Sequence, residues 1–160
     1  MRSVMILLAV AVTADATVVV SNGEAKAKIR PEAFEKLAKS DQLYGKLLGQ
    51  VPSPMFAAFP SLLREPRARR WFLQLTVEGT IAGKLYGLCG LYLVDRAAFS
   101  RAEGAFASSD ATVTISDGDI FYEDGRVSDL FLRPDERDRR RKDGKLPSAP
   151  EFAGFCESLR

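Results

Sequence analysis

ATVTISDGDIFYEDGRVSDLFL, residues 111–132, carries the clearest structural signal in the chain. Two Asp-Gly pairs, Asp117-Gly118 and Asp124-Gly125, separate runs rich in β-branched and aromatic residues. An Asp-Gly pair between two such runs is the strongest short-range cue for a two-residue hairpin turn. The stretch therefore predicts a three-stranded antiparallel meander.

Two-residue turns also fix the register of that meander, because each turn sets which residues face one another. Ile115 would lie opposite Ile120, and Tyr122 would lie opposite both Val113 and Val127. These five apolar side chains then share one face of the sheet, which we expect to be buried.

Two segments before the meander predict further strands. Residues 71–77 are rich in aromatic and β-favouring side chains. Residues 81–94 are apolar on both sides, which is typical of a strand covered on both faces. Glycines at 83, 87 and 90 indicate a bulge or close backbone packing within this strand. With the meander, these segments predict an antiparallel sheet of about five strands.

Helices are predicted before, between and after these strands in the sequence. Residues 28–50 show helical apolar spacing and predict N-terminal helices, and residues 96–107 predict a middle helix. A C-terminal helix follows Ser148, whose side chain would cap it. Residues 51–66 and 133–147 predict irregular connections. The fold class is therefore α+β, with one domain over residues 17–160. The buried stripe expected on the C-terminal helix consists of Phe152, Phe155, Cys156 and Leu159.

Residues 1–16 predict a signal peptide. Arg2 supplies a basic start, an apolar run of nine residues follows from Val4 to Val12, and small residues then offer a cleavage site. Nine residues are too few to cross a bilayer as a helix. The alternative is a hairpin in which residues 4–12 pair with residues 17–21.

The chain of 160 residues contains no histidine and only two cysteines. Histidine is the usual general base near neutral pH, the usual partner of a Ser or Cys nucleophile and a common zinc ligand. The familiar catalytic triads and Cys/His metal clusters are therefore excluded within this chain, and no cofactor is expected.

Cys89 and Cys156 predict a disulfide if the chain is exported, because an even pair of buried cysteines usually bonds in an oxidising compartment. The alternative is two separate buried thiols that pack as small hydrophobic groups.

Five polar side chains are candidates for a histidine-independent site. In the predicted register Asp129 falls on the apolar face, where a carboxylate would be unusual, unless a bulge or the sheet edge turns it outward. The other candidates are Glu123, Lys84, Tyr86 and Tyr122.

The net charge of +2 is small, but the charge is segregated along the chain. Residues 64–70 hold four arginines against one glutamate, and residues 133–145 hold seven cations against four carboxylates. Such runs attract anions, whereas the absence of aromatic residues beside them argues against nucleic-acid binding. The alternative is a pair of solvated charged loops. The candidate anion patch consists of Arg67, Arg69, Arg70, Arg139, Arg140 and Arg141.

These observations together predict an exported, non-catalytic module that binds a protein partner or a surface, without a transmembrane helix. Two alternatives remain open: a histidine-independent enzyme, and an intracellular protein that binds anions or nucleic acid.

Overall fold

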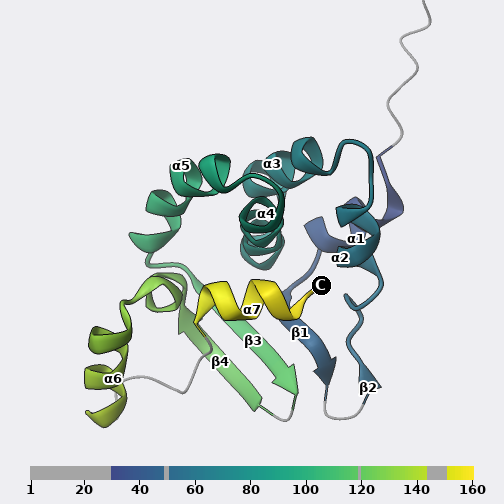
Figure 1. Cartoon of the computed structure of the whole chain (residues 1–160). Coiled ribbons are helices and arrows are strands. Elements are labelled where there is room, and N and C mark those ends of the chain that lie inside the picture. Colours follow the sequence, from purple (N-terminus) through teal and green to yellow (C-terminus); the bar gives the residue numbers. More distant parts are fainter. Residues whose placement is uncertain (1–29, 49–50, 119, 144–150) are drawn as a thin grey trace, which may run out of the picture.

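A computed structural model describes residues 30–48, 51–118, 120–143 and 151–160 (Figure 1). The predicted signal peptide and the Ser148 cap lie outside these residues. The fold is α+β, as the sequence predicted. The elements are α1 (Glu32–Ala38), β1 (Gln42–Leu48), β2 (Val51–Pro52), α2 (Ala58–Leu63), α3 (Ala68–Glu78), α4 (Ile81–Val94), α5 (Arg96–Ala107), β3 (Thr112–Gly118), β4 (Ile120–Arg126), the 3₁₀ helix η1 (Val127–Phe131), α6 (Pro134–Lys142) and α7 (Phe152–Ser158).

The sheet is small and mixed, so the predicted five-stranded antiparallel sheet is wrong. Its described strands run in the order β2-β1-β3-β4, and β2 is only two residues long. β1 and β3 are parallel, with Leu43 beside Ile115, and β3 and β4 form an antiparallel hairpin. The parallel pair needs a long crossover connection, which α2 to α5 supply.

Only the first of the two Asp-Gly pairs lies at a turn, so the predicted meander is also wrong. Asp117 pairs with Ile120, which closes the β3–β4 hairpin. The predicted register of this hairpin is wrong, since Ile115 lies opposite Tyr122 and not opposite Ile120. Asp124 and Gly125 instead lie inside β4, where the register shifts by one residue against β3. Between Tyr122 and Gly125, β4 has one residue more than β3 has between Val113 and Ile115, and such an extra residue is a β-bulge.

The predicted third strand is the 3₁₀ helix η1. Residues i and i+3 of a 3₁₀ helix lie on the same side, so η1 buries both Val127 and Leu130. A strand would have placed Val127 and Asp129 on one face. Burial of two apolar side chains three residues apart therefore favours the 3₁₀ turn.

The two strands predicted at 71–77 and 81–94 are the helices α3 and α4. Buried helices and buried strands have the same continuous apolar pattern, and length is what separates them. At 14 residues, α4 is far longer than an ordinary strand. Thr80 begins it by accepting a hydrogen bond from the Gly83 N–H at 3.0 Å.

Two glycines let α3 and α4 approach closely. A Cβ atom at Gly87 would lie 2.7 Å from the Thr76 nitrogen, and one at Gly90 would lie 2.0 Å from the Phe72 ring. The glycines that seemed to mark a strand bulge therefore mark a tight contact between helices.

Of the other helix predictions, the middle helix and the stripe of the C-terminal helix are confirmed. α5 covers residues 96–107, and Asp95 caps it by accepting a hydrogen bond from the Ala98 N–H at 2.9 Å. Phe152, Phe155, Cys156 and Leu159 are buried. The N-terminal prediction is half right, because α1 is followed by strand β1 instead of a second helix. The segments predicted as irregular contain α2 and α6.

α4 is the centre of the molecule. It packs against α3 and α5, and α7 lies between it and the sheet (Figure 1). This position explains why the helix is apolar all round, since each of its sides faces another element.

Candidate functional site

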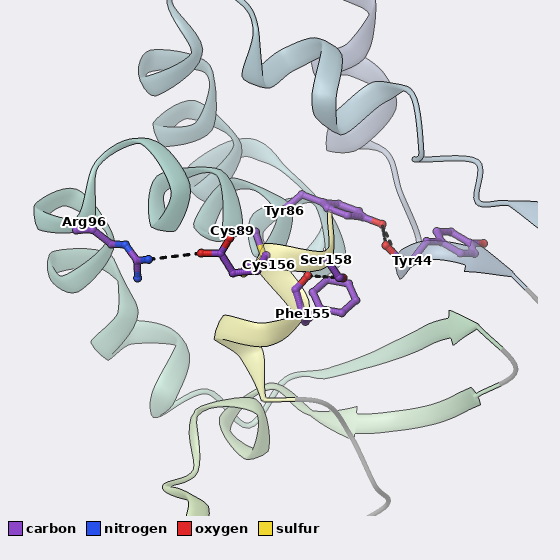
Figure 2. Close-up of a disulfide and its surroundings, with 8 residues drawn as sticks. Tyr44, Tyr86, Cys89, Arg96, Phe155, Cys156 and Ser158 are labelled. Atoms are coloured by element: carbon purple, nitrogen blue, oxygen red, sulfur yellow. Dashed lines mark hydrogen bonds and ion pairs between the residues drawn. A yellow bond between two sulfur atoms is a disulfide. The ribbon is translucent and has the colours of Figure 1, made fainter. Parts of the chain in front are cut away.

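Cys89 and Cys156 form a disulfide, which links the middle of α4 to α7 (Figure 2). Both residues are fully buried, and their Cα atoms are 4.9 Å apart. A cross-link over a separation of 67 residues stabilises a fold by about 4 kcal/mol in the chain-entropy model. The bond joins the last described element of the chain to the central helix.

Tyr86, one of the predicted polar candidates, has a structural role. Its hydroxyl accepts a hydrogen bond from the Tyr44 N–H at 2.6 Å and donates one to the Tyr44 carbonyl at 3.0 Å (Figure 2). The side chain is fully buried, and this burial raises the pKa of the hydroxyl well above its usual value. The Tyr86 hydroxyl therefore links α4 to β1 through these two hydrogen bonds.

Asp129 is a second candidate with a structural partner. Its carboxylate binds Arg140 of α6 at 3.0 Å and also lies 3.5 Å from Arg126. Arg140 also pairs with Glu136 at 3.0 Å. The carboxylate therefore does not lie on an apolar sheet face, because η1 turns it toward α6.

Arg137 provides a second contact between α6 and η1. It is 7% exposed, and it donates a hydrogen bond to the Leu130 carbonyl at 2.8 Å. Sequence reasoning placed this arginine in a solvated connection and missed its role. The spacing of Arg137 and Arg140, three residues apart, would have indicated one face of a helix.

The predicted anion patch divides into two separate regions. Arg67, Arg69 and Arg70 lie at the start of α3, whereas Arg139, Arg140 and Arg141 lie on α6 at the opposite end of the molecule (Figure 1). On α6, Arg139 lies within 4.0 Å of Asp135, and Arg140 has the two carboxylate partners above. Much of the positive charge of this helix is therefore locally balanced.

The region at the start of α3 keeps more of its charge available. Arg69 pairs with Asp95, the residue that caps α5. Arg67, Arg70 and the neighbouring Arg64 are exposed and form no ion pair with any residue the structure describes. We call Arg64, Arg67 and Arg70 the arginine corner, since they lie where α2 turns into α3.

Lys84 lies on the wall of a cavity of about 250 Å³ between α3, α4 and α5. Around it the walls are formed by Thr76, Ile81, Ala105, Phe106, Ser109 and Val127. Lys84 is partly buried and makes no ion pair within the described part of the chain. Sequence reasoning named Lys84 as a candidate but did not predict that Phe106 and Ser109 lie beside it.

The polar candidates do not form one site. Lys84, Tyr86 and Asp129 lie in three different surroundings, at the cavity, beside Tyr44 and against α6. The backbones of Tyr122 and Glu123 belong to β4. No group of three or more metal-ligating side chains occurs among the described residues.

Within the described ranges, no helix has the length and apolar character needed to cross a bilayer. Comparisons of the chain with protein-family models, curated proteins and solved structures found no match.

Proposed function

We propose that this chain is an exported, disulfide-stabilised module that binds a protein partner without catalysing a reaction. The Cys89–Cys156 disulfide is the observation that carries this proposal. Structural disulfides form and persist outside the reducing cytoplasm, in secreted and periplasmic proteins. The apolar run at residues 4–12 supports the same compartment.

Binding is supported over catalysis by what the polar side chains do. The Tyr86 hydroxyl is hydrogen-bonded to the backbone of Tyr44, and the Asp129 carboxylate is paired with Arg126 and Arg140. These two groups stabilise the fold, which leaves Lys84 without a neighbouring acid or base from the predicted set. A histidine-independent enzyme is therefore the weaker alternative.

The arginine corner is the surface that we assign to the partner. Arg64, Arg67 and Arg70 are exposed, lie within seven residues of one another and are not neutralised by a described carboxylate. Unpaired arginines steer and orient acidic partners, and they form strong bidentate contacts with carboxylates. An acidic protein surface is the complementary partner.

The compartment is tested by isolating the protein from its native source and measuring its intact mass and its N-terminus. We expect the mature chain to begin after residue 16 and to be lighter by two hydrogens than the reduced form. A cytoplasmic protein that retains Met1 and two titratable thiols would contradict export.

The binding surface is tested with the triple variant R64Q/R67Q/R70Q in a pull-down from the native extracytoplasmic fraction. We expect the wild-type protein to recover a stoichiometric complex with an acidic protein, weakened by salt, and the variant to lose it. The control R133Q/R139Q/K142Q removes three exposed positive charges from the other end of the molecule and should keep the complex. Equal loss in both variants, or no complex with the wild-type protein, would refute the assignment. Recovery of nucleic acid with a steep salt dependence would favour the intracellular alternative.

A further inference from the structure

The cavity beside Lys84 is a feature that the proposed partner surface does not use. It lies where Ala105 and Phe106, at the end of α5, come close to Ile81 and Lys84, in the first turns of α4. Near that end α5 carries the small residues Gly104 and Ala105. A Cβ atom at Gly104 would meet nothing within 4 Å. Of these two residues, Ala105 lines the cavity, whereas Gly104 lies in open space outside its lining.

The walls of the cavity are mainly apolar. Ile81 comes from α4, Phe106 from α5 and Val127 from η1, so three separate elements supply the apolar surface. Ile81 is still 37% exposed, whereas Val127 is almost fully buried. The cavity thus offers an apolar floor with a partly open side, which suits the hydrocarbon part of a ligand.

Two polar groups face this apolar surface and are available to a ligand. The Lys84 ammonium has no carboxylate partner among the residues described. The Ser109 hydroxyl oxygen accepts a hydrogen bond from the Ala111 N–H at 3.2 Å, and its own hydrogen is donated to no described group. Thr76, by contrast, donates its hydroxyl hydrogen to the Leu73 carbonyl at 2.7 Å. The available donors are therefore one cation and one hydroxyl.

This donor set matches a carboxylate better than a phosphate. A single lysine balances the single negative charge of a carboxylate, and the serine hydroxyl supplies a hydrogen bond to one of its oxygens. A phosphate carries more charge and more acceptor oxygens than these two groups satisfy.

The cavity volume limits the size of the ligand. At about 250 Å³ it lies below the range of roughly 300–1,000 Å³ that accommodates drug-sized ligands. An apolar protein cavity of about 150 Å³ holds benzene. A single ring with a short acid side chain is therefore of suitable size.

We infer that the cavity binds a small amphipathic carboxylate, such as an arylalkanoic acid. The hydrocarbon part lies against Ile81, Phe106 and Val127, and the carboxylate binds the Lys84 ammonium and the Ser109 hydroxyl. This site is separate from the arginine corner, so its failure would leave the proposed partner binding unaffected.

The direct test is calorimetric titration of the full-length oxidised protein with 3-phenylpropanoate, its neutral amide 3-phenylpropanamide, and inorganic phosphate. We expect saturable one-to-one binding of the carboxylate and binding of the amide that is at least about tenfold weaker, because the charge-assisted contact is lost. Inorganic phosphate should not compete. No saturable binding of the carboxylate, or equal affinity for the amide, would overturn the inference without any variant being needed.

Variants then locate the site. Lys84→Met keeps an apolar stem but removes the charge, and we expect at least about tenfold weaker binding of the carboxylate. Ala105→Leu fills the cavity and should abolish binding of both the carboxylate and the amide. Lys142→Met removes a lysine charge on α6 and should leave the affinity unchanged. Thermal unfolding of each variant confirms that it is folded, and unchanged binding by folded Lys84→Met would place the ligand elsewhere.

Discussion

The hydroxyl of Tyr86 satisfies both backbone polar groups of Tyr44, which are 42 residues away in sequence. One side chain of the buried helix α4 thereby completes the hydrogen bonding of strand β1 at a place where no neighbouring strand does so. A buried backbone N–H or C=O without a partner costs roughly 1–3 kcal/mol, so this contact helps to hold α4 to β1.

Tyr86→Phe should therefore destabilise the protein by about 1–3 kcal/mol, because it removes the partner of two backbone groups and leaves the ring packing intact. Urea unfolding of the oxidised protein measures this change. Tyr92→Phe is the matched control, since the Tyr92 ring packs against Phe99 at 5.2 Å and its hydroxyl bonds to no described group. Equal stability of the two variants would show that the Tyr86 hydroxyl contributes nothing.

The same hydroxyl predicts how stability depends on pH in the alkaline range. Burial raises the pKa of Tyr86 in the folded protein well above the value near 10 that it has in the unfolded chain. Below pH 10 the hydroxyl is protonated in both states, so its contribution is fully present. Above pH 10 the unfolded chain loses this proton and the folded protein keeps it, so stability falls as pH rises.

Between pH 9 and pH 11.5, the free energy of unfolding of wild type should fall more steeply than that of Tyr86→Phe. The difference should approach about 1.4 kcal/mol per pH unit, which corresponds to one proton. Identical slopes in the two proteins would mean that Tyr86 ionises normally in the folded state.

Removal of the disulfide should cost about 2–5 kcal/mol, because the unfolded chain regains the freedom of a long loop. The double variant Cys89→Ala/Cys156→Ala tests this by thermal and urea unfolding. Reductant should lower the melting temperature of wild type toward that of the double variant, and should have no effect on the double variant itself. A wild type that is insensitive to reductant would show that the bond adds little stability.

Two glycine substitutions should have opposite effects. Gly87→Ala should destabilise by about 1–3 kcal/mol, because the new methyl group meets the Thr76 nitrogen and the Phe72 carbonyl of α3. Gly104→Ala lies in open space on α5 and should stabilise by about 0.5–1 kcal/mol through helix propensity. Melting temperatures of the pair measure both effects. A neutral Gly87→Ala would argue against the close packing of α3 on α4.

The ion pair between Asp129 and Arg140 should fasten α6 to η1. Arg140→Gln should speed hydrogen exchange of the α6 amides, since the helix makes few other contacts with the body of the protein. A double-mutant cycle of Asp129→Asn with Arg140→Gln should give a coupling of about 1 kcal/mol. The exposed pair of Asp135 and Arg139, 4.0 Å apart, is the control and should give almost none. Equal coupling in both pairs would contradict the anchoring role.

Local signals in the sequence predicted the elements that local chemistry controls. The middle helix predicted at residues 96–107 is α5, and Asp95 caps it because a carboxylate at that position binds free N–H groups of the helix wherever the helix lies. The buried stripe on α7 was also predicted correctly, since apolar residues at helical spacing are buried against whichever element packs on the helix. The cysteine pair was found by composition, because an even pair of buried cysteines usually forms a disulfide if the chain folds in an oxidising compartment.

The candidate site could not be found in this way, because its groups come together only in space. Lys84 was visible as an isolated lysine in an apolar segment. Its relation to Phe106 and Ser109 depends on how α5 packs against the start of α4, and the sequence had indicated a strand at residues 81–94.

Composition, caps and turn residues thus determined by themselves the α+β class, the hairpin at Asp117, the helices α5 and α7, and the absence of histidine chemistry. Tertiary structure alone decided that residues 81–94 form a helix, because a segment buried on all sides has no periodicity that separates helix from strand. It also decided that Asp124-Gly125 lies within β4 beside a bulge instead of at a turn, because the core accepts Val127 and Leu130 from a 3₁₀ turn and so ends the sheet at β4. The residues of 111–132 specified one hairpin, and the packing around them determined what followed it.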